Sequence, residues 1–288
     1  MRRAPPDERP AFTAMQHQPR KRFGQNFLHD PGIIRRILTA IDPRPGDRLV
    51  EIGPGRGALT EGLLAAAVSL DAIELDRDLI GPLVERLHGL GDLRIHSADA
   101  LRFDLCALAP TDDAERRLRL VGNLPYNIST PLLFRFLQQL VCIDDLHLML
   151  QKEVVDRICA APGGKVYGRL SVMVQTWCGT ERLLVIGPGA FQPAPNVDSA
   201  LLRLKPHRPL PYPIDNPDLH ARIVAAAFGQ RRKTLRNSLR GLIDPALLQL
   251  CGIDPSSRAE TVSVAAFARL ANAAGHPAPD GCKEAFKP

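Results

Sequence analysis

The sequence of 288 residues contains no apolar run long enough to cross a lipid bilayer. Its N-terminal stretch is rich in arginine and proline and lacks the apolar segment of a secretory signal. No internal repeat is evident. These absences argue against a membrane protein and against a secreted one, so we expect a cytoplasmic protein.

Cysteines are few and scattered. None of the six belongs to a Cys-x-x-Cys pair, and no cluster of cysteine and histidine has the spacing of a zinc finger. We therefore expect no bound metal and no disulfide framework, and free thiols in a reducing compartment instead. The six are Cys106, Cys142, Cys159, Cys178, Cys251 and Cys282.

Acidic residues are slightly outnumbered by basic ones. Lysine and arginine total 37 against 31 aspartates and glutamates, which gives a net charge of +6. A basic balance favours a polyanionic partner, most commonly nucleic acid, although a basic enzyme without such a partner would look the same. With 45% hydrophobic and 24% charged residues, the chain has the composition of a soluble globular protein.

Short apolar runs alternate with helical patterns between residues 48 and 150. We expect strands at 48–52, 69–74, 93–96, 118–121 and 146–150. Helical patterns run through Leu59–Leu64, Leu79–Leu87 and Pro131–Leu140. Strands and helices alternating at this spacing predict βαβ units, and so an α/β fold with a mostly parallel sheet.

A proline-rich stretch at 205–218 interrupts this pattern, and the chain beyond it reads as purely helical. We predict an α/β domain over residues 21–206 and a small all-helical domain over 207–274. Residues 1–20 are expected to form a disordered basic tail, and residues 275–288 a second tail.

A glycine-rich turn, Glu51–Gly57, follows the first predicted strand. Gly53 and Gly55 let the backbone turn sharply and let a ligand approach the main chain. Glu74 ends the next predicted strand, where its carboxylate can accept hydrogen bonds from both ribose hydroxyls of an adenosine cofactor. By itself this pattern also fits a dinucleotide site.

Two further carboxylates favour S-adenosylmethionine over NAD. Glu51, at the strand end, would repel a pyrophosphate but suits a cationic amino group or a sulfonium. Asp99 ends the third predicted strand, where it can accept from an adenine N6 amine. No catalytic histidine or Tyr-Lys pair follows the turn, as an NAD oxidoreductase would require. The alternative is that these carboxylates only cap helices.

The tetrapeptide Asn123-Leu124-Pro125-Tyr126 follows the fourth predicted strand. An exocyclic aromatic amine is a poor nucleophile because its lone pair is delocalised into the ring. The side-chain oxygen of Asn123 and the carbonyl of Leu124 or Pro125 can accept from its hydrogens and draw the nitrogen towards a tetrahedral shape. Pro125 rigidifies these acceptors, and Tyr126 offers a flat face for a base. A simple Asn-Pro turn is the alternative.

These motifs resemble the ribosomal RNA adenine N6-methyltransferase family, and most closely its small-subunit dimethyladenosine transferase branch. The resemblance covers roughly residues 20 to 273. The matching stretches, in the family's order, are Lys21–Leu28, Glu51–Thr60, Glu74–Asp76, Asp99–Ala100, Asn123–Thr130, Tyr167–Ser171, Phe191–Ser199 and Phe228–Asn237.

The resemblance implies a Rossmann-like class I methyltransferase domain, followed by a helical domain that binds RNA. In the family, the segment matching Asn26 and Leu28 packs over the cofactor, and positions matching Gly53, Glu74, Asp99 and Asn123 line its pocket. Phe191 matches the aromatic residue that faces the target base opposite Tyr126. Asn196 departs from the family, which often has lysine or arginine there, and the loop Leu105–Arg117 is longer than usual.

The family transfers two methyl groups to N6 of each of two adjacent adenosines, in a hairpin near the 3′ end of 16S rRNA. The resemblance therefore implies S-adenosyl-L-methionine as cofactor and the small ribosomal subunit or its precursor as partner. We expect a monomer. A large-subunit rRNA methyltransferase of the macrolide-resistance type and a non-catalytic RNA-binding assembly factor are the alternatives.

The segment Gln230–Arg240 is basic and contains no acidic residue. We predict a helix in which Arg232, Arg236 and Arg240 form one row that tracks RNA phosphates. A solvated helix face is the alternative. The candidate RNA-binding residues are Arg231, Arg232, Lys233, Arg236 and Arg240.

Overall fold

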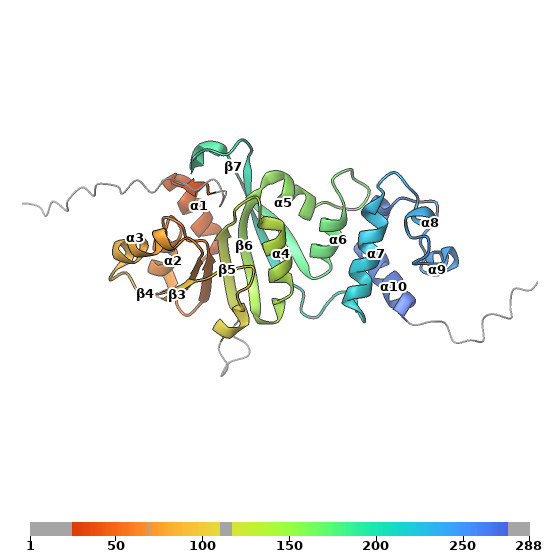
Figure 1. Ribbon diagram of the computed structural model, residues 1–288, viewed down its shortest axis with the longest axis horizontal. Coiled ribbons are helices and arrows are strands. Elements are labelled where there is room, and N and C mark those ends of the chain that lie inside the picture. The colour runs from red at the N-terminus through yellow and green to blue at the C-terminus, as the bar shows by residue number, and fades with distance from the viewer. Residues whose placement is uncertain (1–24, 68, 110–116, 276–288) are drawn as a thin grey trace, which may run out of the picture.

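The computed structural model describes residues 25–67, 69–109 and 117–275, and Figure 1 shows their arrangement. The strands are β1 (Phe27–Leu28), β2 (Arg48–Ile52), β3 (Ser69–Glu74), β4 (Asp92–Ser97), β5 (Leu118–Asn123), β6 (Ile143–Gln151), β7 (Cys178–Ile186), β8 (Phe191–Gln192) and β9 (Ser199–Pro206). The helices are α1 (Pro31–Ile41), α2 (Thr60–Ala67), α3 (Arg77–Leu87), α4 (Ser129–Leu137), α5 (Lys152–Ile158), α6 (Arg169–Gln175), α7 (Pro217–Gly229), α8 (Leu235–Ser238), α9 (Pro245–Leu250) and α10 (Val264–Gly275). Short 3₁₀ helices include η2 (Leu105–Leu108) and η3 (Leu140–Cys142).

A seven-stranded sheet with the order β4-β3-β2-β5-β6-β9-β7 forms the centre of the molecule. Strands β4, β3, β2, β5 and β6 run parallel, whereas β9 is antiparallel to both β6 and β7. The predicted α/β fold with a mostly parallel sheet is therefore confirmed. The strand order reverses between β2 and β5, which is where open α/β sheets bind their ligands.

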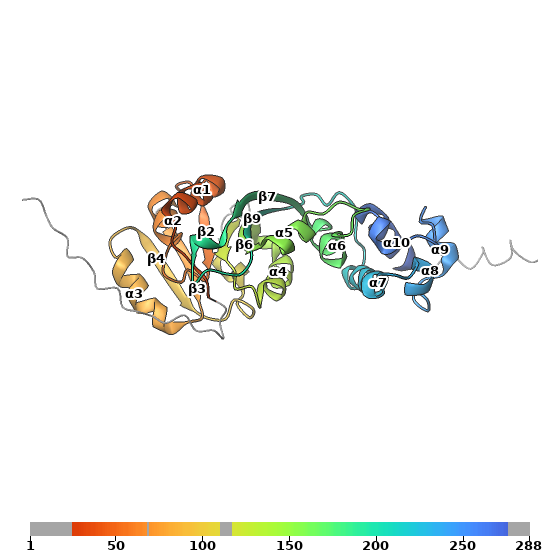
Figure 2. The same ribbon diagram turned by 90° about the horizontal axis from the view of Figure 1, so that it is seen from above.

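Helices cover both faces of this sheet, as Figure 2 shows for α1 and α2 on one side and α4 on the other. Neighbouring strand residues point to opposite faces, so Leu49 packs with the side chains of α1, α2 and α3, and Val50 packs with those of α4 and α5. Both residues are 1% exposed. The apolar strands are thus buried on both sides, which leaves the carboxyl edge of the sheet to bind a ligand.

Helices α7 to α10 lie at the far end of the elongated molecule (Figure 1) and have a separate apolar core around Phe267. Tyr167, Val172 and Met173, which precede the proline-rich stretch, belong to the same core. The Tyr167 hydroxyl donates to the carbonyl of Val262 at 3.0 Å. The helical part therefore packs directly on α6. No helix of the described segments is long and apolar enough to span a membrane.

The prediction of a basic helix over 230–240 is wrong. Helix α7 ends before this segment, and α8 is only four residues long. The reason lies in tertiary hydrogen bonds: the backbone N–H of Leu235 donates to the carbonyl of Ser257 at 2.8 Å, and that of Arg236 to Pro255 at 2.9 Å. A continuous helix would need these two N–H groups for its own hydrogen bonds. Because they donate to residues 255 and 257 instead, Arg232, Arg236 and Arg240 do not share one helical row.

The prediction that all cysteines are free thiols is also wrong. Cys106 in η2 and Cys142 in η3 form a disulfide, with an S–S distance of 2.08 Å. The backbone N–H of Leu105 donates to Gln139 Oε1 at 2.8 Å and so holds the two segments together. Their Cα atoms are 5.4 Å apart, within bonding range, although 36 residues separate them in sequence. Cys159, Cys178 and Cys251 are free.

Some predictions fall outside the described residues. These are the disordered tail over 1–20, the tail beyond Gly275, the thiol of Cys282 and most of the loop inserted after η2.

Candidate active site

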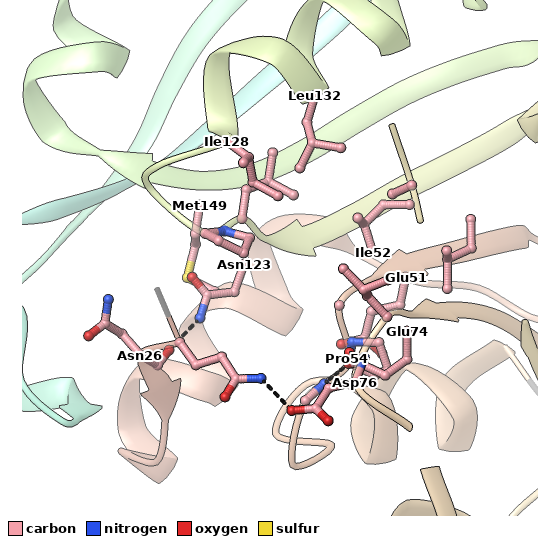
Figure 3. A pocket seen from close by; sticks show the side chains of 18 of the residues that line it. Asn26, Glu51, Ile52, Pro54, Glu74, Asp76, Asn123, Ile128, Leu132 and Met149 are labelled. Atoms are coloured by element: carbon pink, nitrogen blue, oxygen red, sulfur yellow. Dashed lines mark hydrogen bonds between the residues drawn. The ribbon is translucent and has the colours of Figure 1, made fainter. Parts of the chain in front are cut away.

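A cavity of about 330 Å³ opens at the carboxyl edge of the sheet, next to the ends of β2, β3 and β5 and the turn after β4. Figure 3 shows the side chains that converge on it. The predicted residues Asn26, Leu28, Glu51, Gly53, Gly55, Glu74, Asp99, Asn123, Leu124, Pro125 and Tyr126 all line it. The volume lies within the range of small-molecule sites.

The glycine turn after β2 has the backbone conformation that the sequence predicts. Gly53 and Gly55 have φ angles of 65° and 56°, in the left-handed region that favours glycine. A Cβ atom on Gly55 would lie 3.1 Å from Cε1 of Phe27, so a side chain there would also press on the N-terminal segment. The turn therefore presents bare main chain to the cavity.

Glu51 is a buried carboxylate at the end of β2, with 3% of its surface exposed. Among the described residues, none forms a hydrogen bond with its Oε2 atom. Burial, together with the nearby charge of Glu74, raises the pKa of Glu51 to about 7. A buried carboxylate oxygen that has no partner among the described residues fits a cationic ligand group in the cavity.

Glu74 lies across the turn from Glu51 at the end of β3. It accepts hydrogen bonds from the backbone N–H of Gly55 at 3.1 Å and from that of Asp76 at 2.8 Å. Burial raises the pKa of Glu74 despite these bonds. Each carboxylate oxygen keeps a second lone pair, so both can still accept from a vicinal diol.

Asp99, in the turn after β4, uses one oxygen to accept from the backbone N–H of Leu101 at 2.9 Å. This bond closes a turn and does not cap a helix, so Asp99 does not have the helix-capping role that was the alternative. The bond occupies Oδ1, and the residue still lines the cavity, so turn closure and ligand binding are compatible.

Asn123 is oriented by the N-terminal segment. Its Nδ2 atom donates to the backbone carbonyl of Asn26 at 2.9 Å, as the dashed line in Figure 3 shows. Because the amide nitrogen is engaged in this way, the Oδ1 atom is the acceptor of the side chain, and no described residue donates to it. An acceptor at this edge of the cavity is what the predicted chemistry requires.

The turn after Asn123 distinguishes between the two candidate carbonyls. The carbonyl of Pro125 already accepts from the backbone N–H of Ile128 at 3.2 Å. The Leu124 N–H donates to the carbonyl of Met149 at 3.1 Å, which holds the turn against β6. The Leu124 carbonyl is therefore the better second acceptor.

Residues 25–28 contact the glycine turn, the segment after β3 and strand β8. Gln25 Nε2 donates to Asp76 Oδ2 at 3.2 Å, and the guanidinium of Arg56 lies 4.5 Å from the ring centre of Phe27. Strand β1 pairs with β8, with Leu28 opposite Phe191. Sequence reasoning did not identify Gln25, Phe27 or Arg56, although all three lie within or beside the stretches that carried the resemblance.

Phe191 and the basic residues lie elsewhere. Phe191 is 2% exposed, packs in the core beneath α1 and α2, and does not line the cavity. The structure pairs Phe191 with Leu28 and leaves it out of the lining of the cavity that Tyr126 lines. The five basic residues from Arg231 to Arg240 are exposed in the helical part. No group of three metal-binding side chains occurs in the described segments.

A Rossmann-like sheet with a glycine turn, acidic strand ends and an Asn-Leu-Pro-Tyr turn defines a class I methyltransferase. A family model for ribosomal RNA adenine dimethylase matches residues 16–275, and the chain belongs to this family. "Ribosomal RNA small subunit methyltransferase A" of Pseudomonas aeruginosa is 55% identical over 89% of this chain and 95% of its own length. The protein of that name from Marinomonas is 52% identical over the same shares.

Two solved structures share the fold. A dimethyladenosine transferase from Plasmodium falciparum has a TM-score of 0.75 and 24% identity, and covers 86% of this chain and 98% of its own. The 23S rRNA methyltransferase ErmE has a TM-score of 0.68 and 24% identity, and covers 87% of this chain and 100% of its own. Both likenesses extend over the helical part as well as the sheet.

Proposed function

We propose that this protein transfers methyl groups from S-adenosyl-L-methionine to N6 of two adjacent adenosines in a hairpin near the 3′ end of 16S rRNA. It acts as a cytoplasmic monomer on the small ribosomal subunit or its precursor. Membership of the rRNA adenine dimethylase family supports the reaction, and the small-subunit names of relatives 52–55% identical favour this substrate over large-subunit rRNA. The observation that carries the proposal is the oriented amide of Asn123.

The cavity residues fit S-adenosyl-L-methionine. Glu51 Oε2, which has no hydrogen-bond partner in the described part of the chain, suits a cationic group, and the glycine turn leaves room for close approach. Glu74 would hold the ribose hydroxyls and Asp99 the adenine amine. The cofactor supplies an electrophilic methyl group on its sulfonium.

The chain's own contribution to the reaction is to localise the lone pair of the target amine. Asn123 Oδ1 and the Leu124 carbonyl accept from the two amine hydrogens and draw the nitrogen towards a tetrahedral geometry. These acceptors are fixed before the substrate arrives, by the Asn26 carbonyl and by Met149, so little reorganisation is needed. The methylated ammonium is a strong acid that loses its proton to water, so no general base is required.

Tyr126 would stack on the target base. Extracting a base from a hairpin costs a few kcal/mol, and stacking on one aromatic ring returns about 1–3 kcal/mol. Phe191 is a buried residue of β8 and does not line the cavity, so it would face the base from the other side only after the β1–β8 pair moves. Tyr126 therefore carries the larger share of the stacking.

The exposed basic residues of the helical part would contact rRNA phosphates as a cluster rather than a row. Arg231 donates to the carbonyl of Lys165 at 2.5 Å and lies 3.7 Å from Glu260, which ties the segment to the loop before α6. The other basic residues of the segment, Arg232, Lys233, Arg236 and Arg240, are also exposed. Such a cluster contributes sequence-independent, salt-sensitive affinity.

Asn123 variants test the mechanism. Asn123→Ala removes the acceptor and should lower single-turnover methylation about 100-fold or more. Asn123→Asp keeps an acceptor but loses the donor to Asn26, so it should retain more activity than the alanine variant. Calorimetry of cofactor binding to each variant separates catalysis from binding. Near-normal single-turnover methylation by Asn123→Ala, with cofactor saturating, would contradict the proposal.

A further inference from the structure

Ser199 contacts the base-stacking residue from inside the protein. It is the first residue of β9, is 1% exposed, and does not line the cavity. Its Oγ atom lies 2.6 Å from the hydroxyl oxygen of Tyr126, in a hydrogen bond that joins residues 73 apart in the sequence. The far end of the Tyr126 ring is therefore attached to the sheet.

The backbone of Ser199 is fixed on both sides. β9 lies between β6 and β7 (Figure 2), and Ser199 pairs with Gln151 on one side and with Ile186 on the other. The backbone N–H of Lys152 donates to the carbonyl of the preceding residue, Asp198, at 2.9 Å. The serine hydroxyl is thus a fixed point relative to the sheet that holds the cofactor turn.

Tyr126 itself lies in a turn and needs such a point. Its backbone carbonyl accepts from the Ser129 hydroxyl at 3.1 Å, but its ring direction depends on two side-chain torsions that this bond does not set. The ring lines the cavity and is partly exposed. A hydrogen bond at the hydroxyl end restricts both torsions together.

We propose that Ser199 is a positioning residue for methyl transfer: its hydroxyl fixes the ring of Tyr126 at the angle at which the target base stacks in line with the methyl donor. This inference rests on the proposed function, because it presumes that a base is presented to this cavity. Ser199 itself touches neither base nor cofactor. Its effect should therefore appear in the turnover of bound substrate, since misorientation of the reacting groups slows the reacting step.

Ser199→Ala should lower kcat about 2- to 10-fold, the change expected for one neutral hydrogen bond in a transition state. KM for the rRNA substrate and the affinity for S-adenosyl-L-methionine should stay within about twofold. Ser199→Thr keeps the hydroxyl on a strand that tolerates β-branched residues, so it should restore kcat. Ser171→Ala is the matched control, because it also removes a buried serine hydroxyl, but in α6 and away from the cavity.

Tyr126→Phe removes the same hydrogen bond from the other side, so the experiment is a double-mutant cycle in steady-state methylation. If the bond matters, Ser199→Ala, Tyr126→Phe and the double variant should have the same reduced kcat. A wild-type kcat for Ser199→Ala, or losses that multiply in the double variant, would overturn the assignment. Inactivity of the wild-type enzyme on small subunits would instead contradict the proposed function, and with it this inference.

Discussion

Replacing Glu51 with glutamine should change how the stability of the protein depends on pH. Glu51 is buried at the end of β2, and burial together with the charge of Glu74 raises its pKa to about 7, from 4.5 for an unperturbed glutamate. Between these two values the folded protein retains a proton that the unfolded chain releases. Protonated Glu51 therefore makes its full contribution to the free energy of unfolding below about pH 4.5. This contribution decreases as the pH rises and is lost once the pH passes about 7.

The size of the effect follows from the shift. One group changes the free energy of unfolding by at most about 1.4 kcal/mol per pH unit, so a shift from 4.5 to about 7 corresponds to about 3 kcal/mol in total. Glutamine has no titrating proton and a similar shape. The free energy of unfolding of Glu51→Gln minus that of the wild type should therefore increase by about 3 kcal/mol as the pH rises from 4.5 to 8.

Urea unfolding of both proteins across this pH range measures the difference, with Glu85→Gln on the exposed face of α3 as control. The control curve should run parallel to the wild type.

Calorimetry adds a second readout: in the wild type, affinity for S-adenosyl-L-methionine should rise with pH through about 7, because the cation needs the charged carboxylate. Parallel stability curves for Glu51→Gln and wild type would refute the argument from burial.

Three further predictions follow from the same structure. Glu74→Ala should weaken S-adenosyl-L-methionine binding by about 1.5–3 kcal/mol, and unchanged affinity by calorimetry in a folded variant would remove Glu74 from the site. Arg232→Gln should lower the salt slope of log rRNA affinity by somewhat under one unit and leave cofactor affinity unchanged, whereas an unchanged slope would show that this arginine only keeps the surface soluble. Reduction of the Cys106–Cys142 disulfide should lower the free energy of unfolding by about 2–4 kcal/mol; alkylation of both thiols in denatured, unreduced protein would show that the bond is not formed.

The parallel part of the sheet could be predicted from the sequence because its central strands, β2, β3, β5 and β6, are largely buried on both faces. Their apolar residues fall in short segments bounded by turns, as in 48–52 and 69–74, although one buried carboxylate, Glu51 or Asp71, interrupts each run. The antiparallel edge gave a weaker signal. β7 is partly exposed, and Thr180, Glu181 and Arg182 confine its apolar run to its last four residues. β9 runs into the proline-rich stretch.

The candidate site was predictable for a related reason. The carboxyl ends of parallel strands meet at one edge, so carboxylates that end consecutive strands, such as Glu51 and Glu74, must lie close together. Local sequence cannot place contacts between distant segments. The bonds from Asn123 to Asn26 and from Tyr126 to Ser199 span 97 and 73 residues. The prediction of a basic helix was wrong for the same reason, because backbone hydrogen bonds to residues 255–257 take the place of the helical hydrogen bonds in this segment.

The most direct test of the account is methylation of small ribosomal subunits that lack dimethyladenosine, with S-adenosyl-L-methionine as donor and the modified bases mapped. We expect N6,N6-dimethyladenosine at two adjacent positions in the hairpin near the 3′ end of 16S rRNA. The Asn123→Ala variant, which loses the proposed acceptor, should leave both positions largely unmodified. Methylation confined to large-subunit rRNA, or no methylation by folded protein that binds the cofactor, would contradict the account.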